Sequence, residues 1–187
     1  VTKGDLISLV EEKSPTGTGS VEIASNNNSE NLVGVVSTNP GFVGNLGEDL
    51  TEVGDYYLTG AGKDKFELVS MLGQAPVKVS TKNGPIILNT PISTSSLPGI
   101  GARAIKSGQV VGYTVESFNP STMSCISVSS ISEINWPQDN DGTNKIKTCY
   151  KLPDGTYVGK VMAYINLSWY DPSKVETTEK IDSIGWY

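Results

Sequence analysis

The chain of 187 residues contains no histidine and only two cysteines. Without histidine it lacks the commonest general base, the usual catalytic triads, and the ligand of most zinc and copper sites. Two cysteines alone cannot complete a four-ligand structural zinc site. We therefore expect no cofactor, and the sequence assigns no catalytic, cofactor-binding or metal-binding residue.

Charged residues are also scarce, and their balance is unfavourable for binding nucleic acid. They make up 18% of the chain, against roughly 25% in an average soluble domain, and the net charge is −6. A phosphate backbone calls for a clustered basic surface, whereas the 14 lysines and arginines are scattered. No apolar run approaches the roughly 20 residues of a membrane-spanning helix. We expect neither a nucleic-acid partner nor membrane insertion.

Long helix-forming runs are missing as well, and short β-prone segments take their place. They are separated by turns rich in Gly, Pro, Asn and Ser, at about 8–12 residues apart, which is typical of sandwiches and barrels. We therefore predict an all-β fold, a turn-rich β-barrel or β-sandwich of about ten short strands. The expected strands include residues 6–10, 20–24, 32–37, 56–58, 66–72, 75–80, 86–88, 110–115, 125–128, 131–134 and 158–165.

Two local features of these strands are specific enough to test. Residues 125–128 and 131–134 alternate between apolar and polar as a pair of strands would. Pro76 has no backbone N–H to donate, so it belongs at the start of its strand or at a sheet edge.

Cys125 and Cys149 stand 24 positions apart, and we predict a disulfide between them. Disulfides persist outside the reducing cytosol, and the Ser/Thr/Asn-rich composition agrees with that setting. Closing a loop of about 25 residues would contribute on the order of 3 kcal/mol. The alternative is two buried cysteines that never meet.

The segment LVGVVSTNPG at residues 32–41 resembles the "GVVS-x-NP" signature of C-terminal domains on bacterial and phage fibre-like proteins. More distantly, the chain resembles the self-cleaving chaperone domain of phage appendage proteins, a glutamic-type peptidase. The likeness covers roughly residues 4–116 and 157–172. Its further motifs, in the same order, are GDLI at 4–7, LGQAPVKV at 72–79, NGPI at 83–86, TSSLPG at 94–99, GQVVG at 108–112, GKV at 159–161 and WYDP at 169–172.

The chain departs from this pattern in two places. Residues 87–91, ILNTP, replace the expected "GD" turn, and residues 117–156, which hold both cysteines, read as an insertion. The predicted organisation is an all-β domain over residues 1–172 and a polar linker with an aromatic tail over 173–187. Val1 reads as mid-protein sequence, so we expect the chain to come from something longer.

The resemblance implies a non-enzymatic structural or assembly domain of an extracellular fibre, on a cell surface or virion. It also implies a homotrimer, because such domains help chains to trimerise. One alternative is an autoproteolytic chaperone of the same family. A second is a tip that binds a surface glycan or a receptor.

Three groups of residues could carry chemistry under these alternatives. For self-cleavage, Ser37 beside Asn39-Pro40 is the candidate nucleophile, with carboxylates in the loop that follows; the alternative is a strand end and a turn. Asp139, Asp141 and Asn144 resemble half of a calcium loop, but Tyr150 stands where the bidentate Glu belongs. The following aromatic residues could stack on a sugar, or could fill cores and interfaces instead: Trp136, Trp169, Tyr170, Trp186 and Tyr187. In the self-cleavage hypothesis, the carboxylates of the loop that follows Ser37 are Glu48, Asp49 and Glu52.

Overall fold

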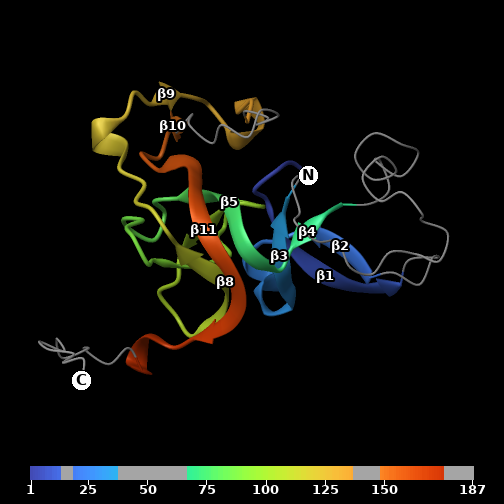
Figure 1. The fold of residues 1–187 in the computed structure, drawn as a ribbon. Helices are drawn as coiled ribbons and strands as arrows, with labels where there is room; N and C mark the ends of the chain where they lie inside the picture. Colours follow the sequence, from blue (N-terminus) through green and yellow to red (C-terminus); the bar gives the residue numbers. More distant parts are fainter. Residues whose placement is uncertain (14–18, 38–66, 137–147, 175–187) are drawn as a thin grey trace, which may run out of the picture.

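The computed structural model describes residues 1–13, 19–37, 67–136 and 148–174, and it confirms the all-β prediction (Figure 1). The described residues form two sheets, joined by turns and short 3-10 helices. None of the helices in these ranges is long and apolar enough to cross a membrane. The first sheet has the order β2-β1-β3-β4, with β1 (Leu6–Lys13), β2 (Gly19–Ile23), β3 (Leu32–Val36) and β4 (Val69–Ser70).

The second sheet is closed into a ring. Its strand order is β5-β7-β6-β8-β11-β10-β9, and β5 also pairs with β11, so that five strands form a small barrel to which β10 and β9 are appended. The strands are β5 (Leu72–Ser80), β6 (Pro91–Ser93), β7 (Gly101–Arg103), β8 (Gly108–Thr114), β9 (Ile126–Ser127), β10 (Cys149–Lys151) and β11 (Tyr157–Tyr170).

The longest strand, β11, holds the barrel together. It is 14 residues long and pairs antiparallel with β5 on one side and with β10 and then β8 on the other. Alternate residues of the β5–β11 ladder point into the barrel, where Val161 lies opposite Val77 and Ala163 opposite Ala75, all buried. The remaining alternate residues form the outer face of this strand pair.

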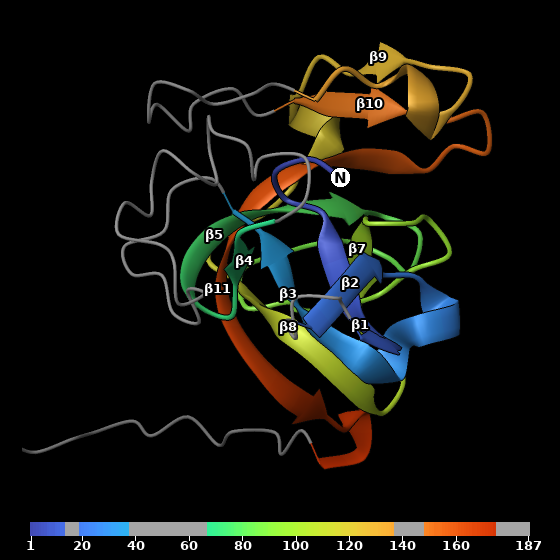
Figure 2. The same ribbon diagram turned by 90° about the vertical axis from the view of Figure 1, so that its right-hand side faces the viewer.

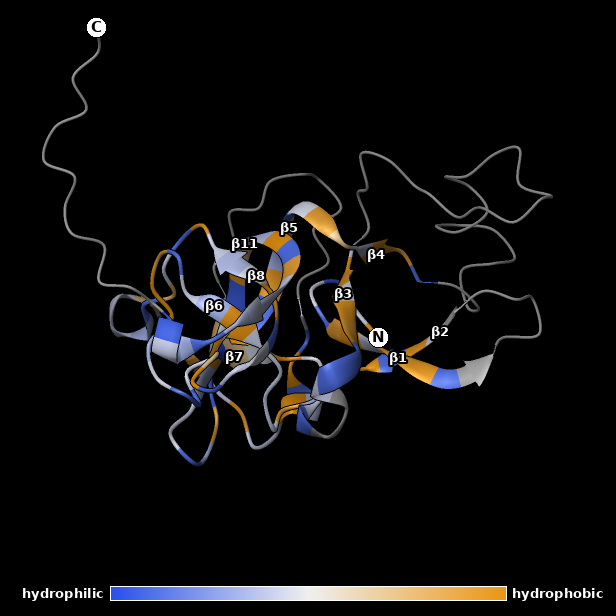
Figure 3. Ribbon diagram, turned by 90° about the horizontal axis from the view of Figure 1, so that it is seen from below, coloured by the Kyte–Doolittle hydropathy of each residue, from blue (hydrophilic) through white to orange (hydrophobic). Residues whose placement is uncertain are grey.

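One hydrophobic core joins the two sheets. In Figure 2 strands β1 to β3 cross in front of the barrel, and β3, hydrophobic along most of its length in Figure 3, lies against β8 and β11. Burying each such valine or leucine side chain stabilises the fold by about 1.5–3 kcal/mol. The core includes Leu6, Leu32 and Val35 from the first sheet and Ala75, Val77, Val79, Ile92, Val111, Val161, Ala163 and Ile165 from the barrel.

A second, smaller core lies on the outside of the barrel. Val158 at the start of β11 and Ile100 before β7 come from the barrel. The other members come from residues 117–156, the segment predicted as an insertion. That segment, with β9 and β10, lies above the barrel in Figure 1. It thereby covers the outer face at one end of the β5–β11 pair. The residues that this segment contributes to the second core are Ile134, Trp136, Tyr150 and Leu152.

Several predicted strands require correction or fall outside the description. Residues 131–134 do not pair with 125–128: η3 (Ile131–Glu133) is a 3-10 turn, and β9 pairs parallel with β10 instead. The Glu133 carboxylate accepts the Ser129 N–H at 3.0 Å and closes that turn. Residues 86–88 form only an isolated bridge, Ile86 to Phe118, and residues 56–58 lie outside the described ranges.

Pro76 lies inside β5, opposite Met162 of β11. On the other side of β5, pairing with β7 begins only at Val79. Pro76 therefore occupies the stretch of β5 that has a sheet neighbour on one side, as its missing N–H requires.

Candidate functional site

The residues immediately before β1 fasten the first sheet to the barrel. The Gly4 N–H donates to the Val36 carbonyl, the Val36 N–H donates to the Asp5 carbonyl, and the Lys78 N–H of β5 donates to the Gly4 carbonyl, each at 2.9 Å. Gly4 has φ +92°, and a Cβ there would lie 3.2 Å from the Pro76 carbonyl oxygen. A glycine is needed at this close approach, and the result is that Asp5 lies beside Lys78.

Asp5 and Lys78 form a buried ion pair. The Lys78 Nζ contacts Asp5 Oδ1 directly, and the two side chains are only 3% and 8% exposed for Lys78 and Asp5 respectively. The Lys78 Nζ also donates to the Thr2 hydroxyl. On its other oxygen, Asp5 Oδ2 accepts the Thr2 N–H at 2.7 Å and the Thr2 hydroxyl at 3.3 Å. A Cβ on Gly99 would lie 2.7 Å from Asp5 Oδ1, so the carboxylate is enclosed on that side too.

Burial governs the titration of Lys78 and of Glu67. It lowers the pKa of Lys78, although the hydrogen bond to Asp5 and the Asp5 charge oppose the shift. Desolvation raises the pKa of Glu67, the N-terminal amino group opposes that shift, and the charge of Asp5 adds to it. The pair is therefore a carboxylate and a lysine held in contact with little water.

A second lysine and a tryptophan complete the cluster. Lys160 of β11 lies opposite Lys78 on the outer face of the barrel, an arrangement of like charges that is unfavourable by itself. The Trp136 ring centroid is 4.7 Å from the Lys78 Nζ and 5.9 Å from the Lys160 Nζ, so one ring faces both cations. Asp5 and Trp136 together offset the repulsion between the two lysines.

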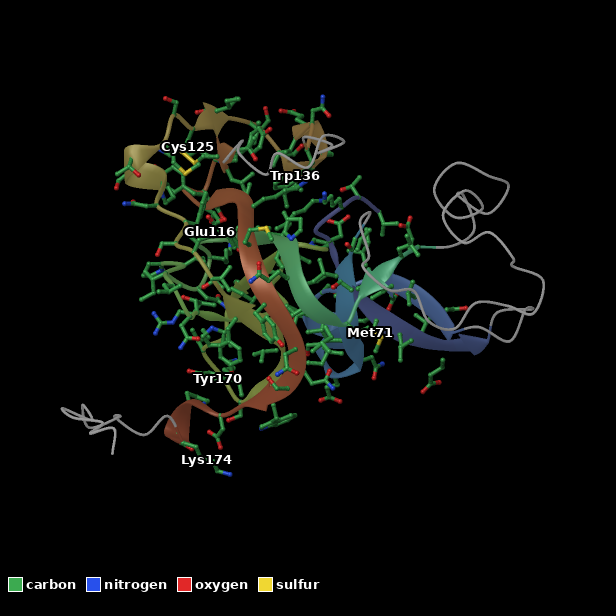
Figure 4. The ribbon with its side chains drawn as sticks, viewed as in Figure 1. Met71, Glu116, Cys125, Trp136, Tyr170 and Lys174 are labelled. Carbon is green, nitrogen blue, oxygen red and sulfur yellow. A yellow bond between two sulfur atoms is a disulfide. The ribbon has the colours of Figure 1, made fainter. Side chains whose placement is uncertain are left out.

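The disulfide holds the segment that supplies Trp136. Cys125 and Cys149 are bonded, as predicted, with the sulfurs 1.98 Å apart, and the bond is visible in yellow in Figure 4. Cys149 belongs to β10, which pairs with both β9 and β11. Trp136 lies between the cysteines in sequence and packs edge-on against Tyr150, with ring centroids 5.7 Å apart. The covalent bond therefore fixes the cover over Lys78 and Lys160.

Within the described ranges, no such segment covers the far end of the same outer face. Along β5 and β11, Leu72 lies opposite Asn166 and Gln74 lies opposite Tyr164, and all four are exposed. Leu72 is 71% and Tyr164 45% exposed. Tyr113 of β8 lies opposite Tyr164 on its other side and extends the row. We call these five uncharged residues, Leu72, Gln74, Tyr113, Tyr164 and Asn166, the outer strip.

Most of the groups expected to carry chemistry lie outside the described ranges. Ser37 follows β3, and its N–H donates to the Leu68 carbonyl at 2.9 Å, as the end of a strand would. Residues 39–40 and the loop carboxylates Glu48, Asp49 and Glu52 lie outside the described ranges, as do Asp139, Asp141 and Asn144 of the calcium hypothesis.

The aromatic residues of the sugar hypothesis also separate. Trp136 is buried over the lysines, whereas Trp169 near the end of β11 is 68% exposed. Tyr170 is half-buried, and Trp186 and Tyr187 fall outside the described part of the chain. Trp136 and Trp169 therefore do not share one stacking surface.

An exposed ion pair gives a prediction that pH can test. Lys82 Nζ lies 2.8 Å from Asp154 Oδ2. The hydrogen bond from Lys82 and the hydrogen bonds from Thr156 together lower the pKa of Asp154 from 3.8 to about 2. Because the folded pKa is the lower one, the stabilisation is present above pH 3.8 and is lost as the pH falls through about 2. In Lys82→Met the pKa of Asp154, followed by carboxyl-carbon NMR, should rise toward 3.8. An unchanged pKa would assign the shift to Thr156 alone.

The chemistry available in the described ranges is thus that of a lysine and a carboxylate. No group of three or more His, Cys, Asp or Glu side chains gathers there to hold a metal ion. Asp5 and Lys78 were not predicted as partners, although both belong to motifs present in the sequence, GD at the opening strand and PVKV in β5. Comparisons of the chain with protein-family models, with curated proteins and with solved structures found no match.

Proposed function

We propose that this chain is a structural assembly domain of an extracellular fibre, and that it associates with copies of itself through the outer strip. The observation that carries the proposal is the division of the β5–β11 outer face. One end is covered by Trp136 and its disulfide-held segment. The other presents the outer strip, of which four residues are exposed, Tyr113 is half-buried and none is charged. Depletion of charge with enrichment of tyrosine is typical of the centre of a protein–protein interface.

Three copies is the number that the resemblance implies. In such a ring, the outer strip contacts the other copies where it lies close to the rotation axis. The disulfide agrees with an oxidising, extracellular location, where such bonds persist. Non-local β-pairing forms slowly, and a domain that aligns three chains would help the rest of a fibre to fold in register.

Charge placed in the outer strip should abolish association. Tyr164→Glu puts an unpaired charge at the centre of the proposed interface, where its desolvation is costly. Sedimentation velocity should show an oligomer for the unmodified chain and a 19.9 kDa monomer for Tyr164→Glu. The matched control is Ile126→Glu, because Ile126 is 61% exposed in β9, which pairs with β10 at the covered end of the face. An oligomer that survives Tyr164→Glu would show that the strip is not the interface.

A further inference from the structure

The Asp5–Lys78 contact has the features that an amide bond between the two side chains would need. The Lys78 Nζ already touches the Asp5 carboxylate, both side chains are almost fully buried, and an aromatic ring shields the nitrogen. Holding a nucleophile against its target in this way replaces an encounter between separate molecules and is worth several orders of magnitude in rate. We infer that Lys78 and Asp5 form an intramolecular isopeptide bond that joins β5 to the residue preceding β1.

The first requirement is a neutral amine. A buried ammonium–carboxylate pair in a low dielectric is costly, and transfer of one proton from the Lys78 Nζ to the touching Asp5 Oδ1 gives a neutral amine and a neutral acid. Burial also lowers the pKa of Lys78, which favours the same transfer. The Trp136 ring keeps the amine away from bulk water.

The second requirement is stabilisation of the oxygen that gains charge. When the Lys78 nitrogen attacks Asp5 Cγ, negative charge develops on Oδ2. That oxygen already accepts the Thr2 N–H at 2.7 Å and is within 3.3 Å of the Thr2 hydroxyl. Two donors aimed at one carbonyl oxygen are the arrangement by which enzymes stabilise a tetrahedral intermediate.

The step balances without any other reactant. The Nζ–Cγ bond forms, the Cγ–Oδ1 bond breaks, and Oδ1 leaves as water with one proton from the first transfer and one from the attacking nitrogen. The ammonium and the carboxylate are both consumed, so the net charge of the pair remains zero. Nothing is oxidised or reduced, and the product is an amide whose N–H and C=O remain in the same enclosed site.

The link would close residues 5–78 into a covalent loop. Asp5 precedes β1, an inner strand of the first sheet, and Lys78 belongs to the barrel, so the bond would tie the two sheets together at the point where their backbones already meet. A domain in an extended surface structure gains resistance to pulling from such a bond. The inference does not depend on self-association, because both residues belong to one chain.

The intact mass of the reduced, denatured chain tests the inference. We expect a mass lower than that of the sequence by one water, and a tryptic digest in which residues 4–13 and 66–82 travel as one branched peptide. Lys78→Arg keeps the positive charge but cannot form the amide, and it should show the full mass. The full mass for the unmodified chain, with 4–13 and 66–78 as separate linear peptides, would overturn the inference. So would a deficit of one water that persists in Lys78→Arg, since it would arise elsewhere.

Discussion

Replacing Lys78 with methionine is expected to lower the free energy of unfolding by about 3–5 kcal/mol relative to the chain in which Lys78 and Asp5 are not linked, because it leaves the Asp5 charge buried without its partner. The Asp5 carboxylate would keep its hydrogen bonds from Thr2. A loss of this size is a large part of the stability of an average domain. Denaturant unfolding followed by circular dichroism would measure it.

The chain offers a matched control for this experiment. Lys82→Met removes the lysine of the Lys82–Asp154 pair, whose side chains are 40% and 49% exposed, and such surface pairs contribute little to stability. The double variant Asp5→Leu with Lys78→Met should lose much less than the sum of its single changes, because it leaves no unpaired charge. Equal small losses for Lys78→Met and Lys82→Met would show that the Asp5–Lys78 pair is not buried as described.

Removal of the disulfide should have the second largest effect. Cys125→Ala with Cys149→Ala is expected to lower the free energy of unfolding by about 3 kcal/mol, the chain-entropy value for a loop of this size. The loss should be accompanied by increased exposure of Trp136, since the disulfide holds the segment that places Trp136 over Lys78. Tryptophan fluorescence and its quenching would report that change.

The location of the effect separates this prediction from general destabilisation. Hydrogen exchange should become faster in β9 and β10, which flank the disulfide. The inner ladder of β5 and β11 should be affected less, because its core residues belong to the main cluster. A uniform increase across the whole barrel would contradict the idea that the disulfide serves mainly the outer segment.

The fold class was predictable because alternation and turns are local signals. Val77 and Val79 alternate with Lys78, which predicts a strand, and both valines do face the barrel core. The prediction of a single buried face was wrong at this end of β5, because Lys78 and Ser80 on the other face are buried too. The prediction of a strand at residues 131–134 was wrong because their alternation is equally compatible with a turn. The S-x-x-E pattern from Ser130 to Glu133 is the local signal that could have indicated a helical turn.

The candidate site was less predictable because its contacts are non-local. Alternation places Lys78 on the outer face of its strand, where solvent is the ordinary expectation. Its burial depends on Asp5, 73 positions earlier, and on Trp136 from the disulfide-held segment, neither of which the pattern around Lys78 reveals. The parallel pairing of β9 with β10 likewise joins residues far apart in sequence. The disulfide was predictable because there are only two cysteines to pair.

The mass of the unmodified chain in solution, measured by light scattering over a range of concentrations, tests the proposed assembly function most directly. For the chain with its disulfide intact, we predict a mass of about three times 19.9 kDa. This mass should not change when the protein is diluted to micromolar concentration. A mass of 19.9 kDa at every concentration would contradict the account, because the outer strip would then be exposed surface with no second copy to cover it.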